Sequence, residues 1–173
     1  MLLHKFYFIA FFVGFVALPS IKSQNIEDNY QYISSLDAQM KRKLIANELI
    51  FDAQDKYLMV NYGNKPTFIV VFEVGSWQPI MTFRLSDWVE FTGAYVDAET
   101  NQLYVKESRY SSDYYRLDIK TGTTEVIACG LTPKGCMVIE PKQSQRWGYS
   151  SDNGILAIID KKNPREVKIY SSK

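Results

Sequence analysis

Residues 51 to 60 read FDAQDKYLMV, and residues 96 to 105 read VDAETNQLYV. Both segments carry an Asp-Ala turn followed by Leu-x-Val, without a gap, at an offset of 45 residues. The same offset places FEV at 72 to 74 on LDI at 117 to 119. Two distant matches at one offset indicate an internal repeat.

A third copy of the repeat lies near the C-terminus. LMVNYGNKPTFIVVF, residues 58 to 72, aligns with LAIIDKKNPREVKIY, residues 156 to 170, at an offset of 98. The aligned pairs are Leu58 with Leu156, Pro66 with Pro164, and Phe72 with Tyr170. The sequence therefore predicts three related units.

Each unit has the pattern of a group of short β-strands. In the second unit, apolar and β-branched runs separated by turn residues predict four strands, over residues 91–98, 102–108, 114–120 and 123–129. FIVVFEV at 68 to 74 and ILAII at 155 to 159 are continuously apolar, so we expect those strands to be covered on both faces. The sequence predicts an all-β protein with stacked sheets.

A period of 40 to 50 residues with four strands per unit is typical of β-propeller blades. YYRLDIKTGTTEVI at 114 to 127, with its Asp-x-x-Thr-Gly turn, resembles the outer hairpin of a TolB-like or WD40-like blade. The resemblance covers roughly residues 44–173 and implies three propeller-blade-like four-stranded repeats, a partial propeller. It implies no partner. Because propellers have 4 to 8 blades, a β-sandwich and a small β-barrel remain alternatives.

The N-terminus has the pattern of a secretory signal peptide. Lys5 precedes an uncharged apolar run over residues 6–18, and small and polar residues follow. The run is shorter than the roughly 20 residues that span a membrane, which favours cleavage over an uncleaved anchor. We expect cleavage after Ser23, with Ser20 as the rival site, and hence a secreted or periplasmic protein.

Three regions follow from these patterns: the signal peptide at 1–23, a linker or short helix at 24–43, and the β-repeat domain at 44–173. The helix is suggested by helical spacing of Ile33, Leu36, Met40 and Leu44.

Charge and histidine content exclude several functions. The chain has a formal net charge of +1, and loss of residues 1–23 removes two of 20 basic residues and none of 19 acidic ones, leaving −1. We therefore expect no nucleic-acid partner, and membrane contact only through the signal peptide or a membrane-protein partner. The only histidine, His4, lies in the leader, so cleavage leaves no imidazole and excludes imidazole-based catalysis and the commonest zinc sites. We expect no enzyme activity, cofactor or metal.

Cys129 and Cys136 flank the turn-forming sequence GLTPKG. A close, even pair of cysteines in an oxidising compartment predicts a structural disulfide.

Acidic residues offer two alternative sites, both disfavoured. Calcium needs six or more converging oxygens, so we expect a set of turn aspartates to bond their own backbone instead: Asp52, Asp55, Asp97 and Asp152. Glycoside hydrolysis needs two carboxyl groups facing each other in a cleft, which the sequence does not indicate for Glu73, Glu107, Glu125 and Glu140.

Aromatic residues and Arg in polar loops are the candidate binding residues: Arg109, Tyr110, Tyr114 and Trp147. Tyr115 and the other tryptophans are expected in the core. The strand at 166–170 ends the third unit, so we expect it to be an unpaired edge that contacts a partner or a second copy, giving six blades; its apolar residues are Val167, Ile169 and Tyr170.

The sequence thus predicts a non-enzymatic secreted or periplasmic protein that mediates protein–protein interaction. We expect an accessory subunit of a bacterial cell-envelope or secretion assembly, with a cell-envelope protein or a homodimer as the partner. The alternative is a glycan- or peptidoglycan-binding module.

Overall fold

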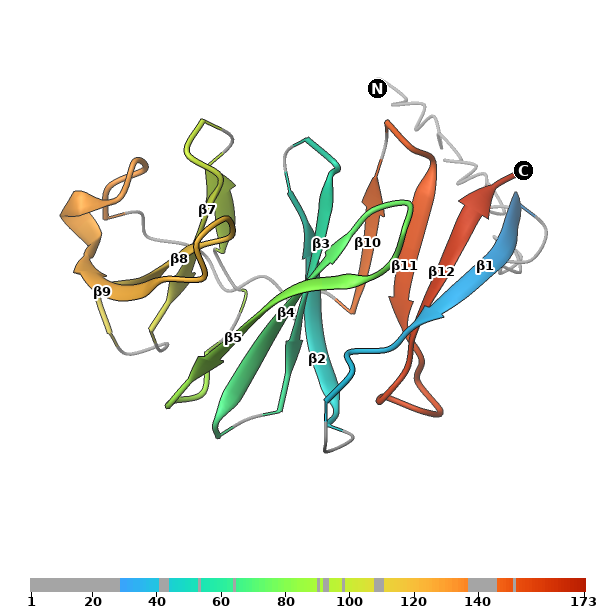
Figure 1. The fold of residues 1–173 in the computed structure, drawn as a ribbon, viewed down its shortest axis with the longest axis horizontal. Coiled ribbons are helices and arrows are strands. Elements are labelled where there is room, and N and C mark those ends of the chain that lie inside the picture. The colour runs from blue at the N-terminus through green and yellow to red at the C-terminus, as the bar shows by residue number, and fades with distance from the viewer. Residues whose placement is uncertain are drawn as a thin grey trace, which may run out of the picture.

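The described part of the chain forms twelve β-strands in three four-stranded antiparallel sheets (Figure 1). The computed structural model describes residues 29–40, 44–52, 54–63, 65–89, 91, 94–97, 99–107, 111–136, 146–150 and 152–173. The described residues also include one short 3-10 helix, η1 (Cys129–Leu131). In this part of the chain, no helix combines the length and apolar composition needed to cross a membrane.

The sheets stand side by side like the blades of a propeller, and we name each by its position in Figure 1. The central blade contains β2 (Ala46–Phe51), β3 (Tyr57–Tyr62), β4 (Thr67–Glu73) and β5 (Pro79–Leu85). The distal blade, on the left, contains β6 (Tyr95–Asp97), β7 (Gln102–Lys106), β8 (Asp113–Asp118) and β9 (Thr124–Ala128). The closing blade, on the right, contains β10 (Trp147–Ser150), β11 (Ile155–Ile159), β12 (Val167–Ser172) and β1 (Tyr30–Leu36).

The sequence repeat is confirmed in three dimensions. An offset of 45 carries β3 onto β7 and β4 onto β8, and an offset of 98 carries β3 onto β11 and β4 onto β12. The four strands predicted in the second unit are β6 to β9. The all-β, partial-propeller prediction is therefore confirmed.

The fourth strand of the closing blade comes from the other end of the chain. β1 pairs with β12 in antiparallel register, from Tyr30 opposite Ser172 to Leu36 opposite Val167. It takes the place that β5 has in the central blade, at the end of the sheet order. The N- and C-terminal strands therefore complete one sheet together.

Two expectations about these strands are wrong. The helix expected from the spacing of Ile33 and Leu36 is not formed, because both residues lie in β1. The edge expected at residues 166–170 is paired on both sides, with β11 and with β1. β1 is extended because its backbone N–H and C=O groups pair with those of β12. Without β1, these groups of β12 would be unpaired on that side of the strand.

The central blade is covered on both faces, as the continuous apolar runs predict. Four of its fully buried residues pack toward the closing blade: Leu58, Val60, Val70 and Phe72. Their neighbours in β3 and β4 pack toward the distal blade: Met59, Ile69 and Val71. The alternation follows from the period of two in a β-strand, and it places one apolar cluster at each blade junction.

Buried polar side chains hold the segment that leads from the central to the distal blade. The Asn61 side-chain amide donates to the carbonyl of Val89 at 2.7 Å, and the Phe91 N–H donates to Glu48 Oε2 at 2.7 Å. Because these side chains are buried, each bond removes a desolvation penalty as well as fixing the path of the chain.

Gly148 in β10 lies where the closing blade packs closely on the central blade. A Cβ there would lie 2.8 Å from Leu49 Cδ1 and 3.2 Å from Phe51 Cδ2. The absence of a side chain therefore lets β10 pack against β2.

We expect Gly148→Val to lower the free energy of unfolding by about 1 to 3 kcal/mol, because the added atoms overpack this junction. Gly130→Val is the control, since a Cβ at Gly130 meets nothing within 4 Å. That variant should stay within about 0.5 kcal/mol of the natural protein in urea denaturation. Equal stability of both variants would contradict the tight junction.

Candidate functional site

The closing blade has one face packed on the central blade and a second face on which, among the described residues, no other sheet packs. Strand register places two rows of side chains across this second face, which we call the open face. The first row is Tyr149, Leu156, Tyr170 and Tyr32, and the second is Trp147, Ile158, Lys168 and Ser35.

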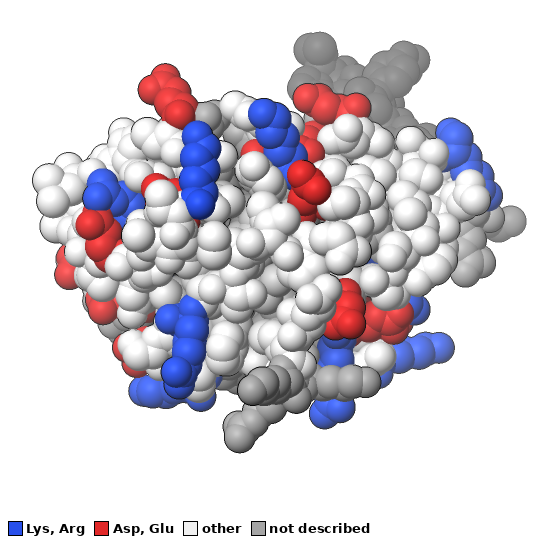
Figure 2. Space-filling view, viewed as in Figure 1, with Lys and Arg blue, Asp and Glu red and all other residues white. Residues whose placement is uncertain are grey.

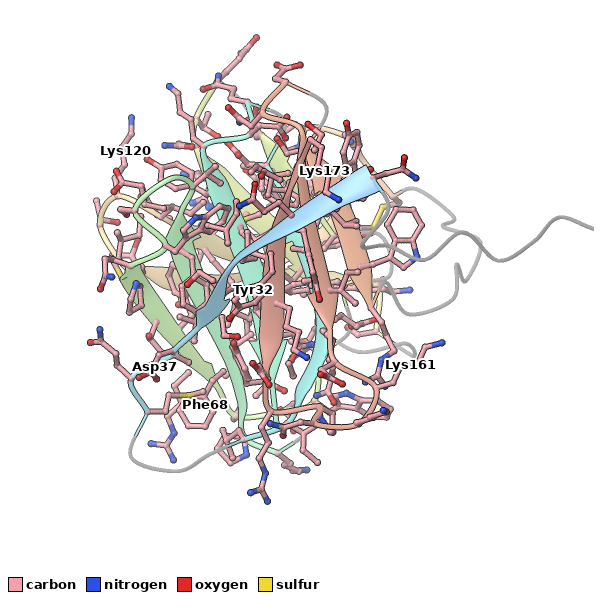
Figure 3. All side chains as sticks on the ribbon, turned by 90° about the vertical axis from the view of Figure 1, so that its right-hand side faces the viewer. Tyr32, Asp37, Phe68, Lys120, Lys161 and Lys173 are labelled. Atoms are coloured by element: carbon pink, nitrogen blue, oxygen red, sulfur yellow. A yellow bond between two sulfur atoms is a disulfide. The ribbon has the colours of Figure 1, made fainter. Side chains whose placement is uncertain are left out.

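Three aromatic side chains of the open face are well exposed: Trp147 by 62%, Tyr32 by 53% and Tyr149 by 46%. The Tyr32 ring meets the Tyr170 ring edge-on at a centroid distance of 5.8 Å, and its hydroxyl is 2.9 Å from Ser35 Oγ. Figure 3 views the molecule from the side of the closing blade, with Tyr32 near the centre on β1. These contacts hold the aromatic row in place at the surface.

The repeat shows what the open face corresponds to in the central blade. At an offset of 98, its residues align with six residues of the central blade: Leu49, Phe51, Leu58, Val60, Val70 and Phe72. Those six belong to the apolar cluster between the central and closing blades. The open face thus has the composition of a blade-packing face, and none of the three described sheets lies on it.

The one cation on this face is neutralised within the chain. Lys168 Nζ forms an ion pair with Asp160, which also accepts N–H bonds from Lys162 at 2.7 Å and Asn163 at 3.3 Å. The Lys168 hydrogen bond and these backbone bonds lower the pKa of Asp160 to about 2. The Asp160 hydrogen bond raises the pKa of Lys168.

Charges of both signs are interspersed on the molecular face drawn in Figure 2.

The outer face of the distal blade, at the other end of the molecule, is more polar. An offset of 45 puts Tyr104 in the place of Met59, Tyr114 in that of Ile69, and Arg116 in that of Val71. Arg116 forms an ion pair with Glu125 on β9. Tyr104 stacks on Tyr95 with ring centroids 5.0 Å apart.

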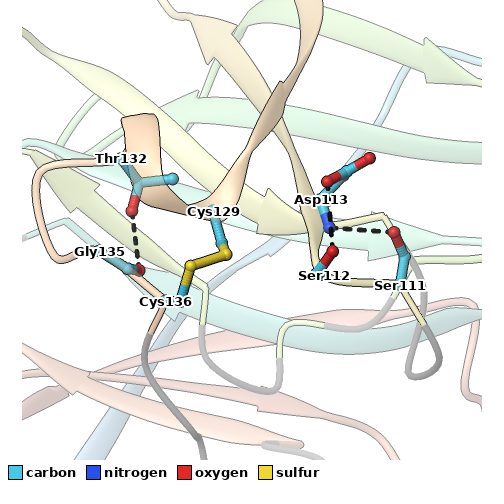
Figure 4. The surroundings of a disulfide bond; sticks show 7 residues. All are labelled: Ser111, Ser112, Asp113, Cys129, Thr132, Gly135 and Cys136. Carbon is cyan, nitrogen blue, oxygen red and sulfur yellow. Dashed lines mark hydrogen bonds between the residues drawn. A yellow bond between two sulfur atoms is a disulfide. The ribbon is translucent and has the colours of Figure 1, made fainter.

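A disulfide-closed loop covers part of this distal face. Cys129 and Cys136 form the predicted disulfide, with Cα atoms 4.7 Å apart, and the Thr132 hydroxyl donates to the carbonyl of Gly135 at 3.1 Å (Figure 4). Lys134 Nζ lies 4.2 Å from the centre of the Tyr95 ring, a cation–π contact. We call residues 129–136 the cap.

Burial of the distal tyrosines agrees with a covered face. Tyr104 and Tyr114 are each 3% exposed. Desolvation is the main cause that raises the pKa of both phenols. The two ends of the molecule therefore differ, since Tyr104 and Tyr114 are buried at the distal end whereas Tyr32, Trp147 and Tyr149 are exposed at the closing end.

The candidate binding residues and the expected edge residues differ in where the structure places them. Trp147 lies at the surface, as expected. The expectation that Tyr114 lies at the surface is wrong, because this side chain is buried on the distal face. Arg109 and Tyr110 lie outside the described residues. Val167 and Ile169 are buried in the core, while Tyr170 is half-buried on the open face.

Sequence reasoning missed Tyr32 and Tyr149. Tyr149 had a signal, because the offset of 98 aligns it with Phe51, an aromatic residue of a blade-packing face. Tyr32 lay in a segment interpreted as helix or linker, and its place depends on pairing with a strand at the far end of the chain.

The acidic residues mostly serve local structure. Asp52 Oδ1 accepts the N–H groups of Lys56 and Tyr57 at 2.7 and 2.8 Å, and Asp97 Oδ1 accepts that of Glu99 at 3.1 Å. The turn interpretation is confirmed for these two. Glu73 and Glu107 each accept a nearby serine hydroxyl. Among the described residues, no three His, Cys, Asp or Glu side chains gather as a metal site.

A pocket of about 400 Å³ lies where β1 ends, beside the turn between β11 and β12. Leu36 and Met40 supply apolar lining, and Asp37 and Arg165 supply charge. Tyr62 also lines the pocket, and burial together with the Asp37 carboxylate raises the pKa of its phenol. The phenol therefore stays protonated at neutral pH and can act as a hydrogen-bond donor.

The sequence matches no protein family and no curated protein. Among solved structures, the chain is similar to the crystal structure of the Cps50 (Swd1) β-propeller domain of Myceliophteria thermophila, with 8% sequence identity and a TM-score of 0.31. The alignment covers 76% of this chain, which spans 52% of that domain. The blade-like repeats are defined by the strand order of the three sheets and by the sequence offsets of 45 and 98.

We expect the Asp160 carboxyl to titrate with a midpoint of about 2 in a carbon-detected NMR titration. Since this pKa is lower than the usual 3.8, the stability it contributes is present above about pH 4 and is lost as the pH falls toward 2. Lys168→Met should raise the midpoint toward 3.8. Lys161→Met, in the same turn, is the control and should leave it near 2; equal midpoints in both variants would contradict the ion pair.

We expect the Cys129→Ser/Cys136→Ser variant to open the cap, because loss of this short covalent loop releases roughly 2 to 3 kcal/mol of constraint. Tetranitromethane should then nitrate Tyr95 and Tyr104 faster than in the natural protein, as measured by mass spectrometry. Tyr62, buried at the other blade junction, is the internal control. Unchanged nitration of Tyr95 and Tyr104 would mean that the cap does not protect the distal face.

Proposed function

We propose that this protein is a non-enzymatic β-repeat module that binds another protein through the open face of its closing blade. The proposal is carried by one observation: Tyr32, Trp147 and Tyr149 are exposed on a face whose repeat equivalents are buried between blades. Large aromatic side chains at the surface are the usual anchors of protein interfaces, because they bury much area with few rotatable bonds.

The composition of the open face supports a contact with another protein. Ile158 provides partly exposed apolar surface between the aromatic residues, Leu156 is buried beneath them, and Lys168 carries its own counter-ion in Asp160. A partner can therefore cover the face without burying an unpaired charge, which would oppose binding.

The difference between the two ends of the molecule supports the same proposal. In stacked repeats, the terminal units need a polar or covered outer face to remain soluble. The distal blade follows this rule with Arg116, its buried tyrosines and the cap, whereas the closing blade keeps aromatic and aliphatic residues. An uncovered apolar face at only one end is what a docking surface requires.

We place the protein in a secreted or periplasmic compartment, as an accessory subunit of a bacterial cell-envelope or secretion assembly. The signal-peptide pattern of residues 1–23 and the Cys129–Cys136 disulfide support this, since such bonds persist where the environment is oxidising.

A glycan- or peptidoglycan-binding module is the second candidate. The row from Tyr149 to Tyr32 crosses four strands, about 14 Å at the usual strand spacing, and tyrosine rings can stack on sugars. The aliphatic residues within the face favour a protein partner, because sugars also need hydrogen-bonding groups beside the rings.

Photocrosslinking tests the proposed function. We expect Trp147→p-benzoylphenylalanine to yield a discrete adduct with a protein of the envelope extract, identified by mass spectrometry and reproduced with that purified protein. The control carries the same group at Ile80 of β5, which is 44% exposed and belongs to the central blade, not to the closing blade. No adduct at position 147 together with specific signals on a glycan array would replace the proposal with the second candidate.

A further inference from the structure

The open face is suited to a second copy of the same chain, and we propose that the protein forms a two-fold symmetric dimer through it. This inference rests on the proposed function, because it names a partner for the same face. In such a dimer the same patch is used on both copies, so the assembly closes at two.

A head-to-tail arrangement is blocked by the distal blade. Six blades from two copies require the open face of one copy to pack on the outer face of the other's distal blade. That outer face carries Arg116 and Glu125 as an ion pair, and Lys134 of the cap lies over Tyr95. Blade packing there would bury these charges and displace the cap, both of which oppose association.

The charge of the open face permits self-association. Two identical faces bring identical charges together, which normally disfavours a symmetric contact. Lys168 is the only ionisable cation or anion in the two rows, and it is paired with Asp160 of its own chain. The Glu166 carboxylate borders the second row, where it accepts the Ser35 hydroxyl and lies near Lys168, so two copies meet mainly through aromatic and aliphatic side chains.

The shape of the open face also matches a second copy. It is one side of a four-stranded sheet, and two such faces pack about 10 Å apart with their side chains interdigitated. Within the chain, the equivalent residues Leu49, Leu58 and Phe72 are covered by another sheet, the inward face of the closing blade with Ala157, Val167 and Ile169, so a face of this composition can be covered by a β-sheet.

The area of the face sets the strength of the dimer. Four strands at about 4.8 Å spacing and roughly five residues at about 3.4 Å give a footprint of roughly 300 Å² per copy. Two copies then bury well under the roughly 1,200 Å² of a standard stable interface. We therefore expect a reversible dimer with a dissociation constant of roughly 10 to 100 µM.

Sedimentation velocity on the purified mature protein, from about 5 µM to about 1 mM, brackets this range. We expect a monomer–dimer equilibrium that stops at the dimer. Trp147→Ser/Tyr149→Ser should weaken the dimer more than tenfold by removing the aromatic area, and Tyr149→Lys should do the same by adding unpaired like charges. Ile80→Ser, an exposed residue on the central blade, is the matched control and should leave the equilibrium unchanged.

Crosslinking then identifies the surface that meets the open face. With Trp147→p-benzoylphenylalanine in a mixture of isotopically light and heavy chains, adducts between copies should map to open-face residues such as Tyr32 or Tyr170. Adducts on the distal blade, or association that continues beyond the dimer, would overturn the symmetric arrangement.

The outcomes separate this inference from the proposed function. A purified protein that stays monomeric at about 1 mM overturns the dimer, yet the proposed function stands if position 147 captures an identified heterologous protein. A dimer that ignores both open-face variants also overturns the inference, because another surface must then hold it. Both proposals fall if the protein is monomeric and position 147 captures no protein.

Discussion

The pairing of β1 with β12 is the interaction on which the rest of the structure depends. It joins segments from opposite ends of the chain over six residue pairs, with one irregularity between Tyr32 and Ser34. Without β1, the closing blade would have three strands, and the backbone of β12 would be open on one side. The same pairing buries Leu36 in the core and places Tyr32 on the open face. Completion of the sheet and assembly of the candidate site are therefore one event.

Much of the fold could be predicted because the repeat is local information. Matched segments at offsets of 45 and 98 give equivalent strands, and continuous apolar runs in β4 and β11 give sheets covered on both faces. The role of β1 could not be predicted in this way. Its partner lies at the far end of the chain, and the spacing of Ile33 and Leu36 fits a helix as well as it fits a strand with an irregular register.

The candidate site was predicted in part for the same reason. Trp147 was identified by residue type, since an aromatic near a strand end often lies at a surface. Tyr114 was misplaced because its neighbour Tyr115 belongs to the core, which directs Tyr114 to the opposite face, and local sequence does not show that this face is covered. Whether an outward side chain is exposed depends on the cap and on neighbouring blades, which are contacts between distant segments.

The strand β10 connects the stability of the molecule with its candidate site. The side of β10 that faces the central blade has only Gly148, because a side chain there would clash. The opposite side of the strand carries the large rings of Trp147 and Tyr149. Because Gly148 lets β10 lie close to Leu49 and Phe51, the central blade fixes the position of the strand and of both rings. The backbone beneath the two rings is therefore held before a partner arrives, so binding costs little backbone ordering. A small, flat face can then support a specific contact despite its limited area.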